Sequence, residues 1–251
     1  MTETHPRSSG ARLPLRASAI FFDYGGTLDT DARHWAHVLY EKYRECAVPV
    51  SEAQFREAYV HGERTLGSSA IIAPTDTFSD VLLKKVDIET RYLTEQGCWA
   101  ADEATRRQVT ADIARRCNGY VLDNLRQTRR VLEALQDRPL CLVSNFYGNL
   151  SAVVRDYGLD RYFRTIVESA AVGIRKPDPA IYRMALERMG VAPGEALVVG
   201  DSFSKDIVPA HSLGCQTVWL KGEEWTPAAH DETLPDAVIG HLAELPALVA
   251  S

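Results

Sequence analysis

Residues 19–30 read AIFFDYGGTLDT, and this stretch decides the fold. An apolar run ends on the carboxylate of Asp23, and the glycine pair Gly25 and Gly26 comes almost at once. A short apolar run bounded by glycines is typical of a buried strand. Ligands bind beyond the carboxyl ends of the strands in an open parallel sheet, and glycines let backbone amides approach an anion closely. We therefore expect Asp23 to lie at a ligand-binding strand end.

The length and charge of the chain limit the class of protein. Its 251 residues suffice for one large domain or for a core with an inserted subdomain. The net charge of −6 comes without any basic block, which disfavours nucleic acid as a partner. No apolar stretch approaches the roughly 20 residues needed to span a bilayer, so no membrane partner is expected either.

The N-terminus and the cysteines predict a cytoplasmic protein. Residues 1–16 lack the apolar core of a secretory signal and are expected to form a disordered leader. The five cysteines are an odd number, widely spaced and without a C-x-x-C pair. Such cysteines are typical of reduced thiols in the cytoplasm.

The sequence changes character between residues 31 and 125. Strand signals are scarce, and apolar residues recur at helical spacing, so that Trp35, Val38 and Leu39 fall on one side of a helix. Ser51 and Gln54 form a capping-box pattern at the start of the next helical segment. We therefore predict an all-helical cap over residues 31–125, inserted after the first strand.

Strands and helices alternate after the predicted cap. Apolar runs that indicate strands occupy residues 140–144, 163–167, 196–199, 217–220 and 237–239. Helical segments and short loops lie between them. This alternation predicts an α/β fold with a doubly wound, Rossmann-like parallel sheet, built from residues 17–30 and 126–251.

Polar groups close to the predicted strand ends would meet in one crevice. They are Asp23, Ser144, Lys176, and Asp201 with Asp206 five residues later. A carboxylate can attack phosphorus, a hydroxyl can hold phosphoryl oxygens, and a lysine can offset their charge. Carboxylates from two strands can hold Mg²⁺, which prefers hard oxygen ligands. The pattern therefore indicates a site for phosphoryl chemistry.

On these motifs the sequence resembles the haloacid dehalogenase superfamily, specifically its phosphatase-like members with a helical cap between the first and second motifs. The resemblance covers the first strand and the predicted core to about residue 248. It implies that Asp23 is a nucleophile that forms an aspartyl-phosphate, with Lys176 as its catalytic partner. The phosphate-binding residues it implies are Thr27, which also holds the loop, Ser144, Asn145 and Lys176.

The resemblance also implies a Mg²⁺ site and a class of substrate. The metal would lie on Asp23, the backbone carbonyl of Gly25 and Asp201, with Asp206 in or near the second layer of groups around it. The implied partner is a small phosphorylated metabolite. The cap would close over it, exclude water and set specificity.

Two positions depart from the family pattern. Phosphatases of this family carry an Asp two residues after the nucleophile, where this chain has Gly25. That Asp protonates the leaving group and later deprotonates the attacking water, a contribution typically worth about 10²–10⁴-fold. Ala171 stands where relatives often have Glu, which would alter the hydrogen bonding of Lys176.

Gly25 leaves three chemical readings open. In the first reading the substrate, such as an acyl, enol or aryl phosphate or a diphosphate, has a leaving group that needs little protonation. Alternatively, a residue near the first motif or in the cap supplies the proton; the candidates are Asp29, Asp31, His34, His37 and Tyr40. In the third reading the chain cleaves phosphonates, as relatives with a small residue at this position do. That chemistry needs a cap lysine, and the chain offers Lys42, Lys84 and Lys85.

Two other functions fit parts of the pattern. A catalytically impaired member of the family would bind a phosphorylated ligand or a protein partner without turnover. Dehalogenases also lack the second Asp, but they normally lose the carboxylate that Asp201 supplies here, which disfavours dehalogenation. The leading expectation is a Mg²⁺-dependent hydrolase that acts on a phosphate ester.

Overall fold

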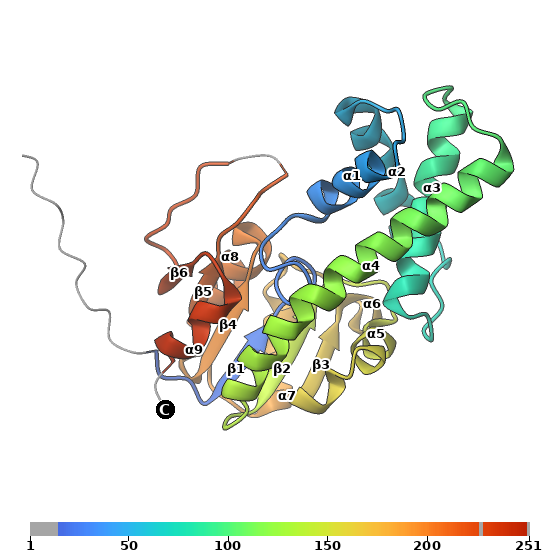
Figure 1. Ribbon diagram of the computed structural model, residues 1–251. Coiled ribbons are helices and arrows are strands. Elements are labelled where there is room, and N and C mark those ends of the chain that lie inside the picture. The colour runs from blue at the N-terminus through green and yellow to red at the C-terminus, as the bar shows by residue number, and fades with distance from the viewer. Residues whose placement is uncertain (1–14, 226–227, 250–251) are drawn as a thin grey trace, which may run out of the picture.

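Six parallel strands form one sheet within residues 15–225 and 228–249, the part of the chain that the computed structural model describes (Figure 1). The strands are β1 Ala19–Phe22, β2 Leu140–Ser144, β3 Phe163–Glu168, β4 Ala196–Gly200, β5 Gln216–Leu220 and β6 Ala237–Ile239. Their order across the sheet is β3-β2-β1-β4-β5-β6. This doubly wound order confirms the predicted fold class. The expected leader, residues 1–16, lies almost entirely outside the described residues.

Helices cover both faces of the sheet and form a separate group beyond it (Figure 1). They are α1 Trp35–Glu45, α2 Glu52–Ser68, α3 Phe78–Glu95, α4 Glu103–Ala134, α5 Leu150–Asp156, α6 Ser169–Val172, α7 Ala180–Met189, α8 Val208–Ser212 and α9 Leu245–Leu248. Shorter helical turns cover Asp160–Tyr162, Pro193–Glu195, Phe203–Ile207 and Leu242–Glu244. None of the helices in the described ranges is long and apolar enough to cross a membrane.

The central strand β1 is apolar on both faces. Ile20 and Phe22 pack in the hydrophobic cluster that includes residues of α4, whereas Ala19 and Phe21 pack in the one that includes α7. All four side chains are fully buried. Strands covered on both faces appear in a sequence as continuous apolar runs, which is why they could be predicted.

The cap group comprises α1, α2, α3 and the first part of α4, and lies to one side of the sheet (Figure 1). The predicted capping box is present at the start of α2, where the Ser51 hydroxyl accepts from Gln54 N and Gln54 Oε1 accepts from Ser51 N. The long helix α4 runs from this group across one face of the sheet as a single element. Near its core end, Thr128 donates its hydroxyl to the carbonyl of Leu28 over 2.7 Å, which ties α4 to the segment after β1.

Candidate active site

Asp23 comes directly after β1, at the point where the strand order reverses. Its backbone N–H donates to the carbonyl of Val199 in β4 over 3.0 Å, so Asp23 still keeps the register of the sheet. Its side chain lies where β1 and β4 end side by side, and the residue is 7% exposed. The crevice outside the carboxyl ends of two strands at such a reversal is the usual ligand site of a doubly wound sheet.

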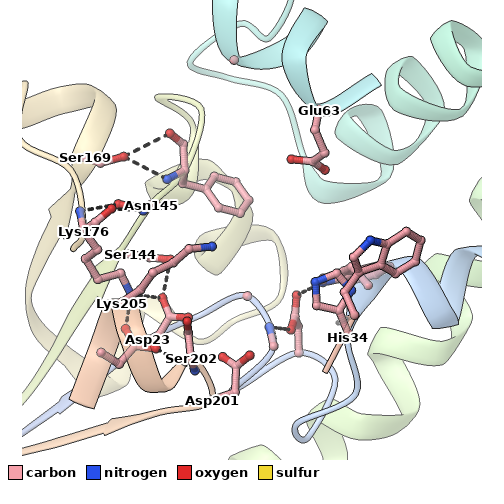
Figure 2. Close-up of a pocket in the computed structure, with 18 of the residues that line it drawn as sticks. Asp23, His34, Glu63, Ser144, Asn145, Ser169, Lys176, Asp201, Ser202 and Lys205 are labelled. Carbon is pink, nitrogen blue, oxygen red and sulfur yellow. Dashed lines mark hydrogen bonds and ion pairs between the residues drawn. The ribbon is translucent and has the colours of Figure 1, made fainter. Parts of the chain in front are cut away.

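Two donors from separate segments meet on one oxygen of Asp23 (Figure 2). Ser144, the last residue of β2, donates its hydroxyl to Asp23 Oδ1 over 2.7 Å, and Lys176 Nζ donates to the same oxygen over 2.7 Å. No hydrogen bond from the described residues occupies Oδ2 of Asp23. One oxygen is therefore held and partly neutralised, while the other is free to react.

Lys176 lies between two carboxylates. Its Nζ donates to Asp206 Oδ1 over 2.6 Å as well as to Asp23, and its third hydrogen bond goes to the carbonyl of Val143 over 3.1 Å. Burial alone would lower the pKa of this ammonium, but the charges of Asp206 and Asp23 outweigh it and raise the pKa above its ordinary value. Lys176 therefore carries a positive charge at neutral pH.

Asp206 is fully buried and saturated with donors. Besides the lysine, Tyr182 on α7 donates its hydroxyl to Oδ1 over 2.9 Å, and the N–H of Ser202 donates to Oδ2 over 3.1 Å. Gly200 makes room for this carboxylate, since a Cβ there would lie 2.4 Å from it. Nothing in the sequence marked Tyr182, because an aromatic residue on a helix usually belongs to the core.

Asp201 is oriented by Thr27. The Thr27 hydroxyl donates to Asp201 Oδ1 over 2.9 Å and accepts the Asp201 backbone N–H over 3.0 Å. Thr27 is fully buried and does not line the cavity, so the structure places it behind Asp201 rather than within reach of a ligand. Gly26 is required here, because its φ is +96° and a Cβ would lie 2.4 Å from the Asp201 carboxylate.

The three carboxylates form a group that suits a hard divalent cation. Asp23, Asp201 and Asp206 each offer an oxygen within 4.8 Å of the others. Burial and the neighbouring charges of Asp23 and Asp206 raise the pKa of Asp201 well above its ordinary value. One ammonium does not balance three carboxylates, and an oxygen-rich donor set with excess negative charge fits Mg²⁺. Gly25, whose carbonyl is the other predicted ligand, lines the same cavity.

Asn145 holds the loop that carries Lys176. Its Nδ2 donates to the carbonyl of Lys176 over 3.0 Å, and its Oδ1 accepts the N–H of Lys176 over 2.9 Å. Asn145 also lines the cavity. Ala171 is exposed on α6 and takes no part in the hydrogen bonds of the Lys176 ammonium described above.

A cavity of about 830 Å³ lies between the sheet and the cap. Its floor carries the three carboxylates together with Ser144, Asn145 and Lys176. Figure 2 shows Glu63 of α2 across the cavity from Asp23. Glu63 forms an ion pair with the buried Lys85 of α3 and accepts the hydroxyl of Tyr147 over 3.2 Å. Sequence reasoning missed Glu63 and Tyr147, because helical periodicity does not show which residues of separate helices and loops meet.

The five candidates for replacing the missing general acid differ in whether they line the cavity. Of the five, Asp29 and His34 line the cavity, whereas His37 and Tyr40 do not. Asp31 also lies outside it, where its carboxylate accepts the N–H of Leu242 over 2.7 Å.

His34 is a poor proton donor. Burial, assisted by the charges of His37, Lys205 and Lys85, lowers the pKa of His34 to about 4, so its imidazole is neutral at pH 7. Its Nδ1 accepts the N–H of Ala36 and caps α1. Within this site, His34 therefore acts as a helix cap and a wall of the cavity.

A family model described as haloacid dehalogenase-like hydrolase matches residues 17–214. The chain belongs to this hydrolase family. A haloacid dehalogenase-like hydrolase domain-containing protein 3 from Danio rerio is 38% identical over 106 residues, which are 42% of this chain and 43% of that protein. A phosphoserine phosphatase from Thermus thermophilus is 41% identical over 88 residues, 35% of this chain and 34% of the phosphatase. The matched part of the chain thus spans less than half the length of these relatives.

Solved structures of the haloacid dehalogenase-like family share the fold. The putative HAD-hydrolase YfnB from Bacillus subtilis, bound to magnesium, matches with a TM-score of 0.57 and 20% identity, over 94% of this chain and 100% of that one. At this identity the likeness concerns the fold alone. Curated relatives of the chain include both phosphatases and dehalogenases.

Proposed function

We propose that this chain is a Mg²⁺-dependent phosphatase that hydrolyses a small phosphorylated metabolite through an aspartyl-phosphate on Asp23. The observation that carries the proposal is the convergence of Ser144 and Lys176 on one oxygen of Asp23. The carboxylates of Asp201 and Asp206 lie beside it.

All five cysteines are free, which supports the cytoplasmic location included in this proposal.

Each residue has a role that its position explains. Oδ2 of Asp23 attacks phosphorus, so that an O–P bond to Asp23 forms and the bond to the leaving group breaks. The Ser144 hydroxyl and the Lys176 ammonium then donate to phosphoryl oxygens. In the second step water attacks the same phosphorus and the O–P bond to Asp23 breaks, which restores the Asp23 carboxylate and releases phosphate that keeps the proton of the attacking water.

The donor set described above would hold Mg²⁺ through Asp23, Asp201 and the carbonyl of Gly25, with Asp206 behind them. When bound, Mg²⁺ supplies positive charge that offsets the phosphoryl oxygens. Asp206 keeps Lys176 aimed at Asp23, because both carboxylates accept from the same ammonium.

Gly25 favours substrates with good leaving groups. Its position has no carboxyl group, and a Cβ built there would meet no atom within 4 Å, so no neighbour has filled the space. Neutral His34 is a poor donor for the leaving oxygen. We therefore expect acyl, enol and aryl phosphates to be hydrolysed faster than alkyl phosphates, which need protonation.

The direct test is release of inorganic phosphate from a panel of phosphate esters with Mg²⁺. Asp23→Asn is expected to abolish turnover on every ester that the wild-type chain hydrolyses. Asp123→Asn changes an exposed carboxylate on α4 in the same way and serves as the matched control. Full activity in the Asp23 variant would reject this nucleophile and with it the proposed reaction.

Phosphonate cleavage is disfavoured by the state of Lys85. Among the three cap lysines considered, Lys85 alone lines the cavity, and it is 6% exposed. It is ion-paired with Glu63, and its Nζ lies 4.1 Å from the centroid of the Tyr59 ring. Burial acts to lower the pKa of Lys85, but the charge of Glu63 outweighs it and raises that pKa well above its ordinary value. An imine with a carbonyl substrate needs a free amine, so borohydride is expected to trap no adduct on Lys85.

A further inference from the structure

Asp29 joins the glycine pair of the first motif to the cap. Its Oδ1 accepts the N–H of Gly26 over 2.7 Å, and its Oδ2 accepts the indole N–H of Trp35 over 2.8 Å. Asp29 is fully buried and lines the same cavity as Asp23. Trp35 is the first residue of α1, so one carboxylate links the loop after β1 to the first cap helix.

The N–H that Asp29 accepts belongs to the peptide group between Gly25 and Gly26. This peptide is trans, so its C=O points away from its N–H and hence away from Asp29. Neither glycine has a side chain that could hold the plane of the peptide. The next carbonyl, that of Gly26, accepts the N–H of Ala32 over 2.7 Å, which fixes the adjacent peptide from the same segment.

We propose that Asp29 is a positioning residue that orients the Gly25–Gly26 peptide and thereby sets the affinity of the site for Mg²⁺, with Trp35 holding Asp29 in place. The inference rests on the proposed function, in which the Gly25 carbonyl is a metal ligand. A carboxylate on the N–H side of a peptide polarises it and makes its carbonyl oxygen a better donor to a cation. Groups that hold metal ligands in place typically contribute roughly 10–100-fold to metal affinity.

The hydrogen bonds favour positioning over proton donation. Burial raises the pKa of Asp29 to about 7, opposed by the hydrogen bonds from Gly26 and Trp35, and such a value suits general acid–base catalysis. Both oxygens of Asp29, however, accept hydrogen bonds from N–H groups. A protonated carboxyl keeps its full acceptor strength on only one oxygen, so two N–H contacts, one on each oxygen, favour the carboxylate form.

The test is Mg²⁺ binding to the full chain, measured by isothermal titration calorimetry and by the rise in Tm with Mg²⁺ concentration. Asp29→Asn sets an amide donor against one of the two N–H groups and is expected to weaken Mg²⁺ binding by about 10-fold or more. Trp35→Phe removes the indole donor, keeps an aromatic ring against Phe78, and is expected to weaken binding by a smaller factor.

Asp31→Asn is the matched control. It removes a carboxylate from the same segment, but the partners of Asp31 are Leu242 and His241 rather than the glycine pair. Its Mg²⁺ affinity is expected to equal that of the wild type. An equal loss in this variant would show that any loosening of the segment weakens the site, which overturns a specific role for Asp29.

Other outcomes also decide the question. Unchanged Mg²⁺ affinity in the Asp29 and Trp35 variants overturns the inference but leaves the proposed function standing. Loss of turnover on alkyl phosphates alone, with Mg²⁺ affinity and p-nitrophenyl phosphate hydrolysis intact, makes Asp29 the proton donor and likewise overturns it. A wild-type chain that binds no Mg²⁺ overturns both. If Asp29→Asn does not fold, Trp35→Phe decides the matter alone.

Discussion

Thr27 and Asp201, 174 residues apart in the sequence, share two hydrogen bonds. The Thr27 hydroxyl donates to the Asp201 carboxylate over 2.9 Å and accepts the Asp201 backbone N–H over 3.0 Å. One small side chain thus serves both the backbone and the carboxylate of Asp201. It fixes the end of β4 against the loop after β1. The residue expected to hold the metal is in this way fixed to the loop that follows Asp23, the proposed nucleophile.

Thr27→Val removes that hydroxyl with almost no change in shape. It leaves a buried N–H and a carboxylate oxygen without their partner, which we expect to cost about 1–3 kcal/mol of unfolding free energy and to weaken Mg²⁺ binding. Urea unfolding and Mg²⁺ titration measure the two effects. Thr27→Ser keeps the hydroxyl and is expected to stay close to the wild type in both, so equal losses in the two variants would refute the explanation.

Lys176→Met tests the charge balance of the site. The variant leaves Asp23 and Asp206 facing each other without their ammonium, and breaking a buried pair in this way typically costs about 3–5 kcal/mol. We expect a loss of that order in urea unfolding, and no turnover of phosphate esters.

The double variant Lys176→Met with Asp206→Asn separates the two effects. Removing one carboxylate relieves the repulsion, so unfolding free energy is expected to recover by about 1–2 kcal/mol while turnover stays absent. If stability does not recover, the lysine acts through packing rather than through charge.

Gly25→Asp tests what the first motif lacks. A Cβ at this position meets no atom within 4 Å, so the backbone has room for the first atom of the new side chain. We expect alkyl phosphate hydrolysis to rise by about 10²–10⁴-fold, because the leaving oxygen would gain a proton donor, with a smaller rise for aryl phosphates. Phosphate release from a matched pair of alkyl and aryl esters checks this. An unchanged ratio would count against an otherwise complete phosphatase site and in favour of a different chemistry or a rebuilt pocket.

We expect Glu89 to make the stability of the cap depend on pH. It is fully buried on α3 and accepts the hydroxyl of Tyr43. Burial raises the pKa of Glu89 to about 7. The charge of Lys85 and the hydrogen bond from Tyr43 oppose this rise, and the charge of Glu63 adds to it. The folded chain therefore holds this proton more tightly than the unfolded chain. Its contribution to stability is complete below about pH 4.5 and is lost as pH rises through about 7, an effect on the order of 3 kcal/mol.

Glu89→Gln is expected to remove this slope. Relative to the wild type, the variant should gain unfolding free energy as pH rises from about 5 to about 8, measured by urea unfolding at several pH values. Glu95→Gln, at the exposed end of the same helix, is the control and should track the wild-type curve. Parallel curves for the wild type and Glu89→Gln would show that Glu89 does not titrate in this range.

The sequence predicted the core of the site better than its surroundings. Parallel strands place their carboxyl ends on one edge, so Asp23, Ser144 and Asp201 could be expected to meet once the strands were recognised. Lys176 was predicted as a site residue from its motif, and in the structure its ammonium contacts Asp23. These positions depend on local pattern and on the rules of a single sheet.

The cap could not be predicted to the same depth. Periodicity identifies the buried side of a helix but not the register of one helix against another. The ion pair between Glu63 and Lys85 depends on the packing of α2 on α3, and Tyr147 reaches it from the core. Asp29 and Asp31 both lie within a few residues of the glycine pair, and only the fold shows that Asp29 is the one that faces the peptide.

The continuous helix α4 bears on how caps can be exchanged between proteins of this fold. A graft at residue 125 would cut α4, Glu103–Ala134, rather than a loop. Each residue added to or removed from a helix rotates its two ends relative to each other by about 100° and shifts them by about 1.5 Å. A donor cap therefore has to match the helical phase as well as the length of α4. An insertion of about seven residues, close to two full turns, would preserve the facing direction of the cap while raising it above the sheet.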